Sequence, residues 1–296
     1  MNEVQIIDVS PRDGLQNERV IVPIEKKIKL IEMLIDSNIN MIEATSFVHP
    51  LKVPQMADAE DVLKSCERFK EVQLIALIPN LKGFQRAVSA NISEVNWITA
   101  ATETFNLKNI GMTVQENFSQ LKQLMDQRNK HNIRVCFSIA VSFGCPYEGE
   151  VNSKNVLTLV ERALEIGVHR IGIADTIGIA SPSEVKNLLK EVLKMAEGVP
   201  VSIHLHDTRG MGLTNAYVAY EAGVRIFETS AGGIGGCPFA PGASGNLATE
   251  DLVYMFERIG VKTGVNFEKL LEAADYAASL TTNKASGRIR HVEKRE

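Results

Sequence analysis

The stretch VSIHLHDTRG, residues 201–210, decides the fold of this chain. Apolar and polar residues alternate from 201 to 205, which predicts a short β-strand that ends at a polar turn. Side chains two residues apart project from the same face of a strand, so His204 and His206 lie side by side at its end. Two such imidazoles provide half of a divalent-metal site, and hydrogen-bonded core histidines are the alternative interpretation.

On both sides of this stretch, predicted strands alternate with predicted helices. The strands cover residues 4–9, 41–44, 72–78, 95–99, 133–141, 170–174, 201–205 and 224–229. The helices include residues 24–37, 112–131, 153–167, 183–196 and 213–222, with two more at 247–259 and 266–280. Strict alternation predicts parallel strands joined by crossover helices. Eight such units over about 250 residues predict an α/β fold, a single closed (β/α)₈ TIM-type barrel with extra C-terminal helices.

Length and composition predict one domain followed by a short tail. Its 296 residues are 45% hydrophobic, which is enough to bury a large core, and no linker or change in composition divides them. We expect a catalytic barrel over residues 1–280. Residues 281–296 carry five Lys or Arg against two Glu, so we expect a polar, basic tail that is loosely ordered rather than a binding arm.

Composition excludes several classes of protein. A net charge of −4 argues against a general nucleic-acid binder. The four cysteines are scattered without a C-x-x-C pair, which argues against a disulfide framework or a structural zinc site. The first residues carry no signal-peptide pattern, and no apolar run approaches about 18 residues. We therefore expect a cytoplasmic protein with no membrane partner.

Polar residues follow several of the predicted strands, at the end of the barrel where active sites of this fold gather. They are Arg12, Asp13 and Gln16 after the first strand, Glu43 at the end of the second, Asp175 after the sixth, and His204 and His206 at the end of the seventh. Each residue alone has an ordinary explanation as a turn residue or a helix cap. Their joint placement at one rim predicts a functional site.

A glycine-rich stretch, AGGIGGCP at residues 231–238, follows the last predicted strand. It is not a dinucleotide-binding motif, because Pro238 stands where the third glycine belongs. Flexible glycines around Cys237 instead indicate a lid that delivers a thiol, and a plain turn with a buried cysteine is the alternative. Cys145, in a second Gly-Cys-Pro triplet, is a rival thiol. Asn246 stands where the next helix is expected to begin, so a helix N-cap is its ordinary role.

Several motifs resemble those of the hydroxymethylglutaryl-CoA lyase family. They are SPRDGLQNE at 10–18, IEATSF at 42–47, the strand end at 203–207, GGCP at 235–238 and GNLATED at 245–251. The similarity runs from about residue 3 to 280. Related barrel synthases that form isopropylmalate or homocitrate typically carry Glu in place of Leu15. A Claisen-type acyl-CoA synthase is therefore the alternative function, and a non-catalytic binding barrel is another.

The resemblance implies a carbon–carbon lyase that cleaves 3-hydroxy-3-methylglutaryl-CoA to acetyl-CoA and acetoacetate, a reaction of leucine degradation. It implies Asp13, His204, His206 and Asn246 as metal ligands, Arg12 as a substrate ligand with Gln16 beside it, Cys237 as the loop thiol, and Glu43 and Asp175 in the active site. Two imidazoles, a carboxylate and an amide oxygen suit Mg²⁺ or Mn²⁺ better than a closed zinc site. An acyl-CoA is then the substrate, and a homodimer is the expected assembly.

The chemistry of such a cleavage needs a base, an acid and a cation. A base takes the proton of the tertiary hydroxyl group while the C–C bond breaks, and Asp175 and His204 are the two candidates. Arg12 can neutralise negative charge that develops on oxygen. A thiol with a pKa near ~8.5 is mostly protonated at neutral pH, so Cys237 can protonate the enolate that leaves.

Overall fold

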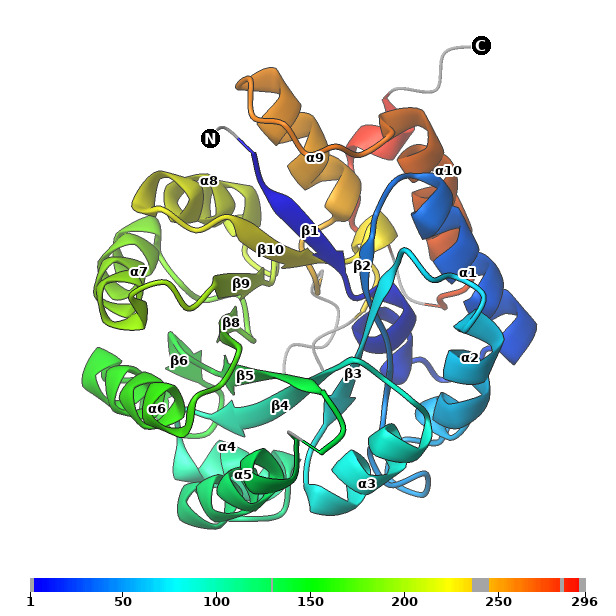
Figure 1. Ribbon diagram of the computed structural model, residues 1–296. Helices are drawn as coiled ribbons and strands as arrows, with labels where there is room; N and C mark the ends of the chain where they lie inside the picture. The colour runs from blue at the N-terminus through cyan, green and yellow to red at the C-terminus, as the bar shows by residue number, and fades with distance from the viewer. Residues whose placement is uncertain (1–2, 129, 236–244, 283–284, 293–296) are drawn as a thin grey trace.

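Eight parallel strands form a closed barrel (Figure 1), which confirms the predicted (β/α)₈ architecture. The computed structural model describes residues 3–128, 130–235, 245–282 and 285–292. The barrel strands are β1 (Gln5–Asp8), β2 (Met41–Ser46), β3 (Gln73–Ile78), β4 (Glu94–Ala100), β5 (Arg134–Ala140), β8 (Arg170–Asp175), β9 (Val201–Leu205) and β10 (Ile226–Thr229). Their order around the barrel is β1-β10-β9-β8-β5-β4-β3-β2, so β1 pairs with β10 and closes the ring.

Helices surround the barrel on the outside (Figure 1). They are α1 (Ile24–Asp36), α2 (Ala59–Cys66), α3 (Leu81–Ser89), α4 (Glu103–Asn109), α5 (Val114–Arg128), α6 (Ser153–Ile166), α7 (Pro182–Ala196), α8 (Gly212–Ala222), α9 (Thr249–Arg258) and α10 (Phe267–Ser279). The last two follow β10, as predicted from the sequence. In the described part of the chain, none of these helices is long and apolar enough to cross a membrane.

Local sequence signals set where helices begin and end. The Ser181 side chain caps α7, Pro182 occupies the first turn, and the Glu184 carboxylate accepts a hydrogen bond from the Ser181 amide. Helix α6 ends at Gly167, whose φ of 82° is a left-handed conformation that favours glycine. Such signals place each crossover helix between two strands and so fix the positions of the strand ends.

Four short helical turns and a small hairpin complete the described elements. The turns are η1 (Ser10–Gly14), η2 (Pro54–Met56), η3 (Ala231–Gly233) and η4 (Ile289–His291). The hairpin consists of the two-residue strands β6 (Gly144–Cys145) and β7 (Gly149–Glu150), which pair antiparallel beyond β5. Periodicity did not predict the hairpin, because two residues are too few to show an alternating pattern.

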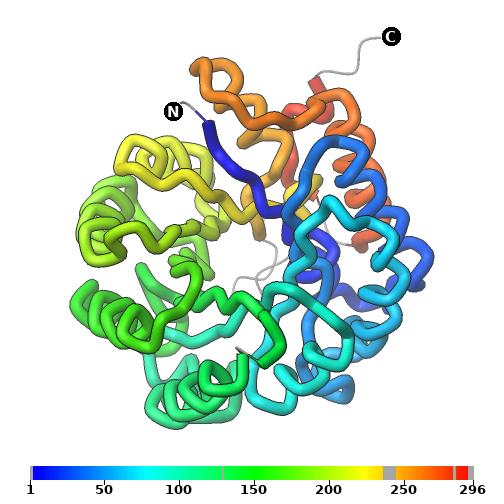
Figure 2. The backbone as a smooth tube through the Cα atoms, viewed as in Figure 1, coloured from blue at the N-terminus to red at the C-terminus, as the bar shows by residue number. Residues whose placement is uncertain are grey.

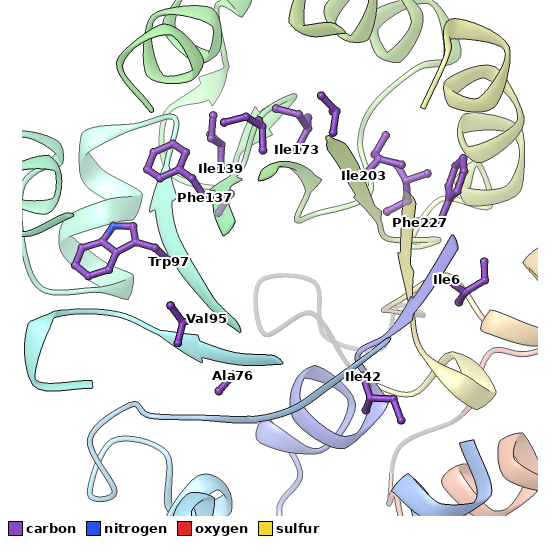
Figure 3. Packing of buried hydrophobic residues seen from close by; sticks show 14 of the residues in the cluster. Ile6, Ile42, Ala76, Val95, Trp97, Phe137, Ile139, Ile173, Ile203 and Phe227 are labelled. Atoms are coloured by element: carbon purple, nitrogen blue, oxygen red, sulfur yellow. The ribbon is translucent and has the colours of Figure 1, made fainter. Parts of the chain in front are cut away.

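The two faces of the barrel sheet differ in character because alternate residues of a strand face opposite sides. Outward residues are apolar and pack under the helices (Figure 3), among them Trp97 and Phe137. Trp97 Nε1 also donates a 2.9 Å hydrogen bond to Asn117 Oδ1 of α5. Inward residues are largely polar: Asn96 donates to Glu43 at 2.9 Å and accepts from Ser138 at 2.7 Å.

A buried ion pair lies inside the barrel at the amino-terminal ends of β4 and β8. Arg170 of β8 donates from Nη2 to Glu94 Oε1 of β4 at 2.7 Å, and both side chains are almost fully buried. Arg170 Nε also donates to the Cys136 sulfur at 3.3 Å. Burial raises the pKa of the Cys136 thiol to about 11, so this cysteine stays protonated at neutral pH. These groups occupy the barrel interior at the end opposite to the carboxyl ends of the strands.

Residues 285–292, part of the expected C-terminal tail, make specific contacts with the rest of the chain. Residues 285–292 run beside α9 (Figure 2), and their backbone and side chains bond to acidic residues of the barrel domain. The backbone amides of Arg288 and Ile289 donate to Asp251 at the start of α9. Arg290 donates to Asp275 of α10 at 3.0 Å. The basic residues of this segment therefore have specific acidic partners, which composition alone did not reveal.

Candidate active site

The predicted rim residues gather around a cavity of about 480 Å³ at the carboxyl ends of the strands. Its lining includes Arg12, Asp13, Gln16, His204 and His206. The other predicted residues in the described part of the chain, Glu43, Asp175 and Asn246, do not line the cavity. Cys237 lies outside the described residues.

The loop that carries Arg12 and Asp13 is tightly turned. It follows β1 as the π-helical turn η1, in which the Val9 carbonyl accepts hydrogen bonds from the amides of Arg12, Asp13 and Gly14. A Cβ at Gly14 would lie 2.6 Å from the side chain of Ile234, so only glycine allows this approach. The turn therefore packs closely against the chain that follows β10.

Arg12 holds two carboxylates at once. Its Nε and Nη2 donate to Glu43 Oε2, and its Nη1 donates to Asp13 Oδ1. Burial raises the pKa of Glu43, and the charge of Arg12 opposes that rise. Asn96 supports the other oxygen of Glu43. Glu43 therefore holds the planar guanidinium group in one orientation, while part of Arg12 faces the cavity.

Asp13 is ionised and joins its own loop to the loop that carries Asn246. Its Oδ1 also accepts from Gln16 Nε2 at 2.8 Å, and its Oδ2 accepts from Asn246 Nδ2 at 2.8 Å. Burial alone would raise the pKa of Asp13, but Arg12 and the two neighbouring imidazoles outweigh it and lower the pKa to about 2. The carboxylate is thus anionic at neutral pH.

The two histidines predicted to be neighbours are in contact. Their Nε2 atoms lie 3.0 Å apart, and their rings meet edge to face with centroids 5.0 Å apart. Burial and the neighbouring His204 lower the pKa of His206 to about 3, so its imidazole is neutral at neutral pH. Ligand atoms of Asp13, His204 and His206 all lie within 4.8 Å of one another.

Asn246 completes this group and is not a helix cap. Helix α9 begins at Thr249 with Ala248 as its N-cap, so the N-cap interpretation of Asn246 is wrong. Its Nδ2 donates to Asp13 and to the Ile234 carbonyl at 3.0 Å. Its Oδ1 is buried without a hydrogen-bond partner among the described residues. A buried amide oxygen in that position is costly unless another group binds it.

These four residues fit a divalent cation of the Mg²⁺ or Mn²⁺ type. Two ligand atoms at right angles around an ion, each at about 2.1 Å, would lie about 3 Å apart, and the two histidine Nε2 atoms are 3.0 Å apart. The unpartnered oxygen of Asn246 and the carboxylate of Asp13 add oxygen donors. A mixed set of nitrogen and oxygen donors is unlike the sulfur-rich sites of structural zinc.

Asp175, at the end of β8, stabilises the turn that leads into α7. Its two carboxylate oxygens accept 3.0 Å hydrogen bonds from the amides of Ile179 and Ala180, which shape the turn before α7. Burial raises its pKa, and those amides oppose the rise. A direct catalytic role for Asp175 remains a prediction.

Glu228 is a cavity residue that the sequence did not single out. It lies in β10, lines the cavity, and accepts a 2.7 Å hydrogen bond from Ser202. Its Oε2 lies 3.9 Å from His204 Nδ1, so the two side chains are neighbours at the cavity wall. The available signal was a glutamate two residues after Ile226, which places both side chains on the same face of the strand.

Cys145, the rival thiol, lies away from the cavity lining. Its buried sulfur accepts hydrogen bonds from Thr102 Oγ1 at 3.1 Å and from the Tyr147 amide at 3.4 Å. These contacts fix the small hairpin to the end of β4. Cys145 is therefore a packing residue in the described part of the structure.

The fold and this site define a class, the carbon–carbon lyases built on a barrel, to which the chain belongs as an enzyme. The model of the HMGL-like family matches residues 3–276, and the chain belongs to this family. Within it, the hydroxymethylglutaryl-CoA lyases are the proteins that the chain resembles over nearly its whole length.

Two mitochondrial hydroxymethylglutaryl-CoA lyases illustrate the likeness. The rat protein is 44% identical over 97% of this chain and 88% of its own, and the human protein is 42% identical over the same shares. A zebrafish relative, named as a cytoplasmic 3-hydroxy-3-methylglutaryl-CoA lyase, is 40% identical over 97% of this chain and 85% of its own.

Solved structures agree with this assignment. An HMG-CoA lyase from Acinetobacter baumannii, in complex with coenzyme A and 3-methylmalate, has a TM-score of 0.94 and 41% identity. The alignment covers 99% of this chain and 95% of that one. The Bacillus subtilis HMG-CoA lyase has a TM-score of 0.95 and 41% identity, and covers 100% of this chain and 99% of its own.

Replacing His206 by Ala tests the proposed ligand cluster. We expect Mn²⁺ binding, measured by isothermal titration, to weaken by more than about 100-fold, because changes outside the ligand shell alone reach about 10- to 100-fold. Thermal unfolding of the metal-free protein should change little. His131→Ala, at an exposed position remote from the rim, serves as the control. Wild-type Mn²⁺ affinity in His206→Ala would contradict the assignment.

Proposed function

We propose that this enzyme holds one Mg²⁺ or Mn²⁺ ion through Asp13, His204, His206 and Asn246. With it, the enzyme cleaves 3-hydroxy-3-methylglutaryl-CoA to acetyl-CoA and acetoacetate. The observation that carries the proposal is the meeting of a carboxylate, two imidazole nitrogens and an unpartnered amide oxygen at one rim. A bound divalent ion polarises the substrate's hydroxyl group and lowers its pKa.

The reaction breaks the bond between C2 and C3 of the substrate. A base removes the proton of the C3 hydroxyl, and the oxygen's electron pair becomes the new C=O bond of acetoacetate. The electron pair of the broken C–C bond passes to C2, which leaves as the enolate of acetyl-CoA. One proton delivered to that carbon yields acetyl-CoA, so atoms and charge balance.

Arg12 is the residue that we propose to stabilise developing negative charge. Glu43 and Asp13 hold its guanidinium group, so little reorganisation accompanies the reaction. Since Arg12 also lines the cavity, its remaining N–H donors can reach a substrate oxygen. Gln16, which lines the cavity beside it, is proposed to bind the substrate.

The proton donor proposed for the enolate is Cys237. The three described cysteines, Cys66, Cys136 and Cys145, are buried, which supports a donor elsewhere in the chain. For the base we keep both candidates, Asp175 and His204. His204 lines the cavity, whereas both oxygens of Asp175 accept backbone hydrogen bonds.

The CoA part of the substrate is proposed to lie over the loops that follow β2 and β3. The cavity extends there, with the apolar side chains of Val48 and Val53 beside the amino groups of Lys52 and Lys82. Apolar groups suit the pantetheine arm, and the two lysines suit phosphate groups. In the barrel order these loops lie across the mouth from β9, which carries the histidines.

The other functions weighed from the sequence have less support. The relatives are named lyases rather than synthases, and the assembled rim argues against a non-catalytic barrel. We further propose a cytoplasmic location, supported by the zebrafish relative that is named cytoplasmic, although the rat and human relatives are named mitochondrial. A homodimer remains our prediction for the assembly and can be tested by analytical ultracentrifugation.

Acetoacetate release tests the proposed function directly. Purified protein with 3-hydroxy-3-methylglutaryl-CoA should release acetoacetate, followed through NADH oxidation by a coupled dehydrogenase. Chelation should abolish the activity, and Mg²⁺ or Mn²⁺ should restore it, because the ion lowers the pKa of the hydroxyl group. Net condensation of acetyl-CoA with a 2-oxo acid, without cleavage, would favour the synthase instead.

Arg12→Gln should lower kcat by about 10²- to 10³-fold with a much smaller rise in KM, the loss expected for a donor that acts in the transition state. Arg12→Lys is the matched control, since it keeps the charge and loses the planar fork. Both variants leave Glu43 with a weaker partner, so circular dichroism must establish that they are folded at the assay temperature. A change confined to KM would make Arg12 a ground-state binding residue.

Cys237→Ser should lower activity by about 10²-fold or more, because a serine hydroxyl is a much weaker acid than a thiol. Metal content should not change, since the thiol is not proposed as a ligand. Cys145→Ser is the matched control and should cost little activity. An alkylating reagent, mapped by mass spectrometry, should label Cys237 fastest of the four cysteines; preferential labelling and activity loss at Cys145 would overturn the assignment.

A further inference from the structure

The C-terminal segment, residues 285–292, bonds to the chain on both sides of residues 236–244. Ser286 Oγ donates to the Gly233 carbonyl at 3.1 Å and lies 3.5 Å from the Asn246 carbonyl. The Gly287 amide donates to the Gly232 carbonyl at 3.1 Å. A serine and a glycine of the segment thus contact both the turn after β10 and the backbone of a proposed metal ligand.

The segment fits this place closely because glycines stand at the contacts. A Cβ at Gly233 would lie 2.1 Å from Ser286 Oγ, and a Cβ at Gly287 would lie 1.9 Å from Glu250 Oε1. Gly233 also has a φ of +59°, which disfavours other residues. Glu250 is itself buried and accepts a 3.0 Å hydrogen bond from the Gly232 amide. Segment, carboxylate and turn therefore form one packed unit.

Hydrogen bonds to two aspartates fix the position of the segment along the barrel domain. The carboxylate of Asp251 accepts the amides of Arg288 and Ile289 at 2.8–3.1 Å, in the first turn of α9. Arg288 Nη2 donates to Asp207 Oδ2 at 2.8 Å, and Asp207 directly follows His206. The other oxygen of Asp207 accepts the Gly212 amide at the start of α8. The segment thus touches the chain next to two of the four proposed ligands.

We infer that the C-terminal segment is a positioning element of the active site: it holds the backbone at Asn246 and the side chain of Asp207, and so sets the affinity for the divalent ion. The inference rests on the ligand set of the proposed function. The physical reason is that contacts outside the ligand shell orient the ligands, and their loss typically weakens metal affinity about 10- to 100-fold.

Full-length Gly287→Val and Ser286→Ala test this role, with His291→Ala as the control. His291 is exposed in the same segment. Mn²⁺ affinity is measured by electron paramagnetic resonance of the free ion, and hydrogen–deuterium exchange of the metal-free protein reports on residues 245–249. Gly287→Val should weaken Mn²⁺ binding about tenfold or more and speed exchange there. Ser286→Ala should weaken binding by about two- to tenfold, the worth of one hydrogen bond.

Activity separates positioning from a merely structural role. If the segment acts through the ion, excess Mn²⁺ should restore kcat of Gly287→Val to nearly the wild-type value. A kcat loss that excess Mn²⁺ does not restore, together with earlier unfolding of the metal-free variant, would overturn the inference. Unchanged Mn²⁺ affinity and exchange in both segment variants would overturn it as well.

The His206→Ala variant separates this inference from the proposed function. If His206→Ala weakens Mn²⁺ binding while Gly287→Val does not, the ligand set stands and only the role of the segment is wrong. If His206→Ala binds Mn²⁺ as tightly as the wild type, the proposed ligand set itself is wrong.

Discussion

The arrangement of side chains at the rim depends on the hydrogen bonds that the ionised carboxylate of Asp13 accepts. It accepts from Arg12 and Gln16 of its own loop and from Asn246, which lies 233 residues further along the chain. A buried carboxylate without partners costs several kcal/mol, so the guanidinium and amide groups are needed to keep it charged. With them, the carboxylate lies beside both histidines, of which His206 is neutral. Hydrogen bonds thus fix the positions of the proposed ligand groups relative to one another, and such prior ordering lowers the cost of binding.

The polar interior of the barrel is a second constraint. Glu43, Asn96 and Ser138 form a hydrogen-bonded row below Arg12, and Arg170 pairs with Glu94 beneath them. Buried ion pairs of this kind are often no better for stability than well-packed apolar residues, because desolvation offsets the attraction. Stability alone therefore does not explain an interior built of charges. The row of Glu43, Asn96 and Ser138 instead holds the Arg12 guanidinium group in one orientation.

Much of this could be predicted from residue patterns, and the limits have physical causes. The alternation of strands and helices predicted the barrel, and the two-residue spacing of His204 and His206 predicted their contact. Both predictions rest on local geometry. Asn246 looked like a helix cap, since a pattern cannot fix a helix start to within two residues. Glu228 was missed because inward and outward faces of a short strand differ by one residue of register. The docking of residues 285–292 depends on acidic partners scattered through the chain, which no local pattern encodes.

Closure of the ring by β1 and β10 has a consequence for synthesis of the protein. Strand β1 leaves the ribosome before the other described barrel strands, yet its parallel partner β10 is made after all of them. Until then the nascent chain carries an unpaired strand edge, which is open to association with other chains. The Asp8 carboxylate likewise accepts hydrogen bonds from the Ala231 amide and the Thr249 hydroxyl, which are synthesised much later than Asp8. Cotranslational folding can therefore build most of the helical layer first, but the rim can form only after β10 and Asn246 have been synthesised.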